Sequence, residues 1–104
     1  MNAAAISRPD LTRTIAALAA YDTIEREFAD GLTQDEATAL FERSDAAKAD
    51  IGDAFALDTA DRNEPAVARS WATFNVERTR SFVGWIEAGG AVEQMRLGVK
   101  STSA

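Results

Sequence analysis

The segment Val67–Ile86 constrains the fold more than any other part of this sequence. It contains both tryptophans and two of the five phenylalanines. At about 100° per residue, its apolar side chains cover roughly half of a helix circumference. An ordinary surface helix has an apolar stripe only somewhat wider than about 100°. We therefore expect a central helix, over about residues 65–88, that other helices cover on two sides.

Helix start and stop signals define two more long helices ahead of this segment. The first is expected over about residues 8–30, where Gly31 offers the left-handed residue that commonly follows a helix. Thr33 and Glu36 then form a capping box, the most specific local signal in the chain. This box starts a second helix over about residues 34–56. The short connection makes the two helices antiparallel neighbours.

The same signals delimit the central helix and the C-terminal part of the chain. Pro65 suits a first helical turn, and Gly89 with its neighbouring glycine ends the helix. Residues 91–99 have a weak helical pattern, and the tails 1–6 and 100–104 are expected to be frayed. The 104 residues are therefore predicted to form one all-α domain, an antiparallel three-helix bundle with a short C-terminal helical segment.

The composition removes most catalytic and metal-binding chemistry. The chain has no cysteine, so it has no thiolate metal ligand, and it has no histidine. Histidine is the commonest general base and the commonest transition-metal ligand. The glycines match no phosphate-binding loop. We expect no cofactor, no metal and no catalytic residue, and so a protein that is not an enzyme.

The sequence also lacks the patterns of membrane and secreted proteins. The longest apolar run, Ile15–Tyr21, is seven residues and far too short to cross a bilayer. The first residues have no basic segment ahead of an apolar one, so they do not resemble a signal peptide. A cytoplasmic protein without membrane contact is the expectation.

Acidic residues are concentrated in the middle of the chain. The net charge is −6, and residues 22–64 hold thirteen acidic and four basic residues. This charge argues against direct nucleic-acid binding, which needs a basic surface. On the predicted second helix, one face carries five carboxylates, which could bind a partner protein with a basic surface or could simply be solvated. They are Asp35, Glu42, Asp45, Asp50 and Asp53.

A second candidate surface lies on the predicted central helix. Val76, Val83 and Ile86 form an apolar patch at the edge of the surface that the first two helices could cover, and a homodimer could form through it. The tryptophans and Phe74 lie along another line of this helix, where core packing is favoured over a binding role. Arg78 interrupts that line, either as a structural ion pair or as a binding residue.

Two functions from different classes are consistent with these surfaces. The first is a small acidic interaction factor, most concretely an inhibitor or regulator that docks its acidic face on the nucleic-acid-binding surface of a partner. Anti-defence proteins of phages and mobile elements offer an analogy of size and charge alone. The alternative is a structural or adaptor subunit that self-associates through the apolar central helix. An enzyme with a site at Arg78 is a distant third.

Overall fold

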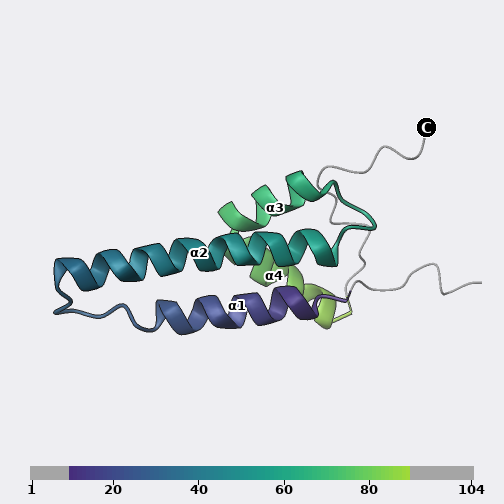
Figure 1. Ribbon diagram of the computed structural model, residues 1–104. Coiled ribbons are helices and arrows are strands. Elements are labelled where there is room, and N and C mark those ends of the chain that lie inside the picture. Colours follow the sequence, from purple (N-terminus) through teal and green to yellow (C-terminus); the bar gives the residue numbers. More distant parts are fainter. Residues whose placement is uncertain (1–9, 90–104) are drawn as a thin grey trace, which may run out of the picture.

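The computed structural model describes residues 10–89, which form four α-helices (Figure 1). The helices are α1 (Thr12–Glu25), α2 (Gln34–Asp58), α3 (Pro65–Phe74) and α4 (Val76–Glu87). The all-α prediction is therefore confirmed for this range. The weak helix expected at 91–99 and the tails 1–6 and 100–104 lie outside the described residues.

The helices form two pairs of unequal length. Figure 1 shows α1 and α2 side by side as a long hairpin, with α3 and α4 against one half of it. Among these elements, α2 packs mainly on α1 and α3, whereas α4 also contacts α1. The other half of the α1–α2 hairpin, toward its connecting loop, extends past the α3–α4 pair. We call this part the arm.

The start of α2 agrees with the sequence prediction. The Glu36 amide donates to the Thr33 hydroxyl at 3.1 Å, and the Thr33 amide donates to the Glu36 carboxylate at 2.8 Å. Gly31 has the positive φ of 88° expected of it. Gly31 turns the chain from α1 toward α2, and the capping box gives hydrogen-bond partners to the Thr33 and Glu36 amides at the start of α2.

The predicted end of the first helix, near residue 30, is wrong, because α1 stops at Glu25. The Glu27 amide donates to the Ile24 carbonyl, three residues back, so the helix tightens and ends. Arg43 of α2 then holds Glu27 by two hydrogen bonds of 2.9 Å. The connection is thus fixed by contacts with α2 before the glycine is reached.

The predicted single helix over residues 65–88 is also wrong, because it breaks at Asn75. The Asn75 backbone is non-helical (φ −137°, ψ 57°), and its side-chain amide donates to the Trp71 carbonyl at 2.8 Å. The Asn75 carbonyl then accepts from both the amide and the hydroxyl of Thr79, each at 2.9 Å. Asparagine competes with the backbone for hydrogen bonds in this way and so favours helix ends. The bundle therefore has four helices in the described range, not three.

The break changes which side chains reach the core. Val76, Val83 and Ile86, predicted to form an exposed interface, are buried in the same core as α1 and α2 residues. The prediction failed because a continuous helix carries its angular phase through Asn75, whereas the real α4 starts with a new orientation. Phe55 of α2 lies within this core and meets Phe82 edge-on, with ring centroids 5.9 Å apart.

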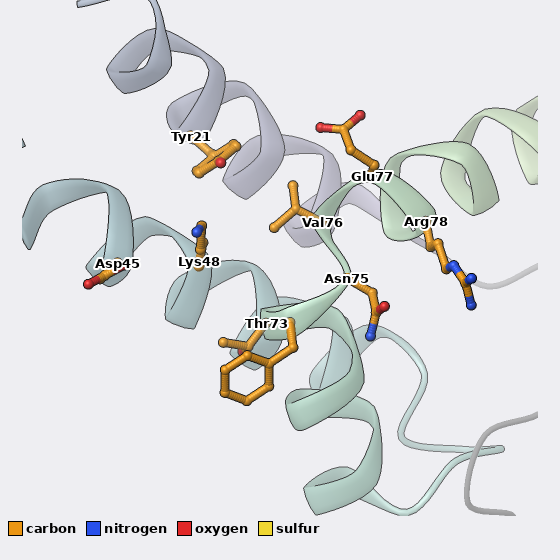
Figure 2. Close-up of a pocket in the computed structure, with 9 residues that line it drawn as sticks. Tyr21, Asp45, Lys48, Thr73, Asn75, Val76, Glu77 and Arg78 are labelled. Carbon is orange, nitrogen blue, oxygen red and sulfur yellow. The ribbon is translucent and has the colours of Figure 1, made fainter. Parts of the chain in front are cut away.

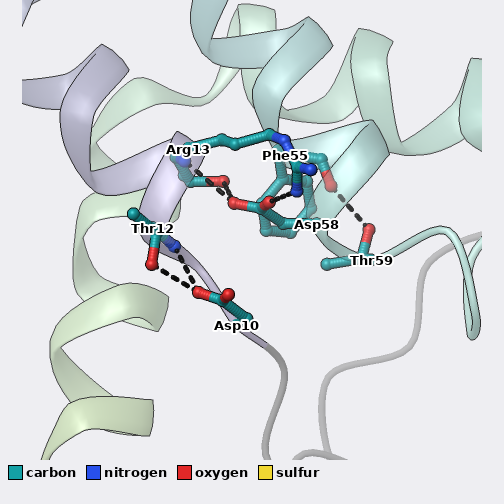
Figure 3. Close-up of polar contacts among 7 residues, drawn as sticks. Asp10, Thr12, Arg13, Phe55, Asp58 and Thr59 are labelled. Carbon is teal, nitrogen blue, oxygen red and sulfur yellow. Dashed lines mark hydrogen bonds and ion pairs between the residues drawn. The ribbon is translucent and has the colours of Figure 1, made fainter.

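Two close contacts hold the helices together, one between the two pairs and one within the α1–α2 hairpin. Gly52 lies where α3 crosses α2, and a Cβ atom there would be 2.6 Å from the Arg69 carbonyl oxygen. The absence of a side chain at Gly52 therefore allows the two helices to approach this closely. At the end of α2, the buried Asp58 carboxylate accepts hydrogen bonds from Arg13 and Thr14 of α1 (Figure 3).

Candidate interaction surfaces

The five acidic residues singled out in the sequence are all exposed on α2. We call Asp35, Glu42, Asp45, Asp50 and Asp53 the acidic ridge. They stand on one unbroken helix of 25 residues, which is about 36 Å long. A single helix of this length fixes the spacing of the charges, since its backbone does not bend between them in the way a loop would.

Most of the acidic ridge forms no ion pair within the part of the chain that the structure describes. Asp53 pairs with Arg69 of α3 at 2.8 Å, and both side chains are exposed. The other four carboxylates form no ion pair with any residue between 10 and 89. Their charge is therefore directed at solvent, where an external cationic group could meet it.

A second surface is a hollow of about 680 Å³ beside the turn that joins α3 to α4 (Figure 2). Its lining comes from three places: Tyr21 of α1, Asp45 and Lys48 of α2, and the turn at 73–78. A second hollow, of about 210 Å³, shares these α1 and α2 residues and runs on along the arm. We call the two hollows together the groove.

Aromatic side chains stand at both ends of the groove. Phe74, at the end of α3, is 81% exposed, and Phe41, on the arm, is 61% exposed. Phe41 packs on Phe28 with ring centroids 5.2 Å apart, so it is held in place although one side faces water. Exposed aromatic side chains of this kind are typical of contact surfaces between proteins.

The charges around the larger hollow are balanced. Two are negative, Asp45 and Glu77, and two are positive, Lys48 and Arg78. In Figure 2 the Arg78 guanidinium points away from Lys48 and Tyr21, so these groups do not converge on one point. These four charged side chains therefore do not form a site suited to acid–base catalysis.

A structural ion pair was one interpretation of Arg78, and residues 10–89 do not supply a partner for it. Arg78 is exposed and forms no ion pair within residues 10–89. The ion pair belongs to its neighbour Arg80, which binds Asp22 of α1 at 2.8 Å and Glu77 at 3.2 Å. Hydrogen bonds to Asp22 and Glu77 raise the pKa of Arg80 further above its ordinary value.

Sequence reasoning missed the two exposed phenylalanines. It placed Phe74 on a line of side chains for which core packing was favoured, and it gave Phe41 no binding role. Both lie where the α3–α4 pair stops short of the arm, and that position depends on the break at Asn75. The spacing of apolar residues along one helix gives no indication of where the helix that covers it will end.

The described part of the chain contains no cluster of three or more acidic side chains arranged to hold a metal ion. None of the helices between residues 10 and 89 is long and apolar enough to span a membrane. Comparison of the chain with protein-family models, curated protein sequences and solved structures gave no match. The class that the fold defines is an all-α helical protein, and its function has to be argued from its surfaces.

Proposed function

We propose that this protein is a non-enzymatic interaction factor that docks its acidic ridge on a basic surface of a partner protein. The observation that carries the proposal is the row of four carboxylates on α2 that lack ion pairs within the described chain. Such a row lowers the free-energy cost of binding a cationic surface, because no internal salt bridge must first be broken.

The spacing of the ridge suggests how it would act. The four unpaired carboxylates extend from Asp35 to Asp50, fifteen residues apart and about 22 Å along the helix axis. A rigid row of negative charges of this length resembles a stretch of phosphates to a protein that binds nucleic acid. The proposed activity is inhibition or regulation, in which the ridge covers the basic surface and keeps nucleic acid away from it.

This proposal is tested with two variants that change the net charge equally. The ridge variant carries Glu42→Lys and Asp50→Lys, which leave the Asp53–Arg69 pair and the groove intact. The control carries Asp61→Lys and Glu87→Lys, at exposed positions away from the ridge. Each protein is immobilised, exposed to lysate of the native cell and eluted with steps of increasing salt. The binding of each identified protein is then measured with purified material.

We expect the wild type and the control to retain a basic protein that is released between low and moderate salt, because exposed charge pairs are screened over about 10 Å at 0.1 M. The ridge variant should lose it. Equal retention by the ridge variant would show that the carboxylates are not the binding surface. Competition between the protein and nucleic acid for the purified partner then tests the occlusion mechanism.

A further inference from the structure

We infer that two copies of this chain form a symmetric dimer, in which the α3–α4 pair of each copy packs against the groove of the other. This dimer uses a different surface from the acidic ridge, apart from Asp45, and so goes beyond the proposed partner binding. It rests on the shape of the helix pairs, on the exposed aromatic side chains and on the balance of charge around the larger hollow.

The shape is that of a step. The α3–α4 pair covers one half of the α1–α2 hairpin, and the groove begins where this pair ends (Figures 1 and 2). When two copies are related by a twofold axis, the α3–α4 pair of each copy can pack on the uncovered arm of the other. In a symmetric interface of this type the same surface patch serves both partners.

Four of the six large apolar side chains that are exposed between residues 10 and 89 lie on the arm or on the α3–α4 pair, the two parts that this arrangement would join. Phe41 lies on the arm, whereas Val67, Phe74 and Trp85 are exposed on the α3–α4 pair. Phe74 is the most exposed of them and lies at the turn, which is where the two short pairs would meet. A side chain of this size in water is stabilised when a partner surface covers it.

The charges favour a second copy over a basic partner. The protein as a whole has a net charge of −6, but the large hollow is lined by two acidic and two basic side chains. A basic partner in the groove would bring like charges toward Lys48 and Arg78. A second copy instead brings Arg78 to Asp45 of the other copy, and the symmetry repeats this contact. Neither side chain has an ion-pair partner within residues 10–89 of its own chain.

The dimer leaves most of the acidic ridge free. At about 100° per residue, Asp35, Glu42 and Asp50 lie at least about 120° around α2 from Lys48, which lines the groove. The two surfaces therefore face different directions, and a variant in one need not affect the other. Only Asp45 belongs to both.

The test is sedimentation equilibrium of the purified full chain over a wide range of concentrations. We expect a monomer–dimer equilibrium that Phe74→Ser weakens by about tenfold or more, since the change removes an apolar contact twice in each dimer. Leu57→Ser is the matched control, because Leu57 is also exposed but lies on the side of α2 opposite Lys48. Helical circular dichroism and melting temperature establish that each variant is folded.

A charge exchange then tests the predicted pairing. Asp45→Arg and Arg78→Asp should each weaken the dimer, because each places like charges together, and the double variant should restore it. Asp35→Arg alters the net charge as Asp45→Arg does but should leave the dimer unchanged. A wild type that is monomeric at every concentration overturns the inference. A dimer that neither Phe74→Ser nor the single charge variants affect overturns it as well, because it must use another surface.

Discussion

Asp58 at the end of α2 accepts two hydrogen bonds from Thr14 in the first turns of α1. The Thr14 amide donates at 2.9 Å and its hydroxyl at 2.8 Å, and the Asp58 side chain is 0% exposed. The contact joins residues 44 positions apart in the chain. It fixes the start of α1 against the end of α2, at the end of the hairpin opposite the connecting loop.

Replacing Asp58 by alanine should therefore be costly. The Thr14 amide and hydroxyl would stay buried without an acceptor, and each unsatisfied buried group costs about 1–3 kcal/mol. We expect Asp58→Ala to lower the free energy of unfolding by about 2–4 kcal/mol in urea denaturation followed by circular dichroism. Asp61→Ala, at an exposed position three residues away, should change it by less than about 0.5 kcal/mol. A similar small change for both would show that the Thr14 contact contributes little.

Two glycines in helices should respond to alanine in opposite directions. An alanine Cβ at Gly52 would meet Arg69 and Thr73 of α3, so Gly52→Ala should force the two helices apart and destabilise the fold by at least about 1–3 kcal/mol. Gly84 of α4 has nothing within 4 Å of the same position. Gly84→Ala should instead stabilise the protein by up to about 1 kcal/mol, through helix propensity alone. Paired thermal melts of the two variants compare the signs directly.

Asn75→Ala should destabilise the protein by about 1 kcal/mol, because it removes the side-chain hydrogen bond to the Trp71 carbonyl. In the middle of an exposed helix the same change would stabilise, since alanine has the higher helix propensity. The sign of the change in unfolding free energy therefore tests whether the chain breaks at this residue. A stabilised Asn75→Ala variant would indicate a continuous helix from α3 into α4.

The capping box gives α2 a dependence on pH. Hydrogen bonds from Thr33 hold the pKa of Glu36 below its ordinary value of 4.5. Because the folded pKa is the lower one, the stabilisation is present above pH 4.5 and is lost as the pH falls through the folded pKa. Glu36→Gln keeps an acceptor for the Thr33 amide but does not titrate in this range.

The wild type should therefore be more stable than Glu36→Gln at neutral pH, and the difference should shrink as the pH falls below 4.5 and through the folded pKa. Urea denaturation of both proteins across this range measures it. A difference that stays constant down to the lowest pH would mean that the ionised form of Glu36 is not what stabilises the helix start.

The parts of the fold that could be predicted from sequence are those with local chemical signals. Thr33, Glu36 and Gly31 specify the start of α2 within a few residues of chain, and the structure has the capping box that they predict. Pro65 likewise begins α3. The exposure of the five acidic residues followed from the apolar face of the same helix, which left them no place in the core.

The rest depends on contacts that a periodic pattern does not contain. The apolar surface of Val67–Ile86 covers half of a helix circumference because it belongs to two helices, each with its own narrower stripe. Asn75 marks their boundary, but without glycine or proline it gives only a weak signal. A pattern continued through that boundary assigns Val83 and Ile86 to a surface and Phe74 to a packed face. The groove could not be predicted, since it lies where one helix pair ends beside another.

The unequal length of the two helix pairs has a consequence for local opening. Amides in the half of α2 that α3 and α4 cover, near Ile51 and Phe55, should exchange with deuterium only on global unfolding. In the monomer, those near Glu36 and Leu40 are supported by α1 and the loop alone, so they should exchange through smaller openings. The half of α2 near Ile51 and Phe55 would then keep its conformation while a partner binds. The half near Glu36 and Leu40 could adjust its conformation to that partner.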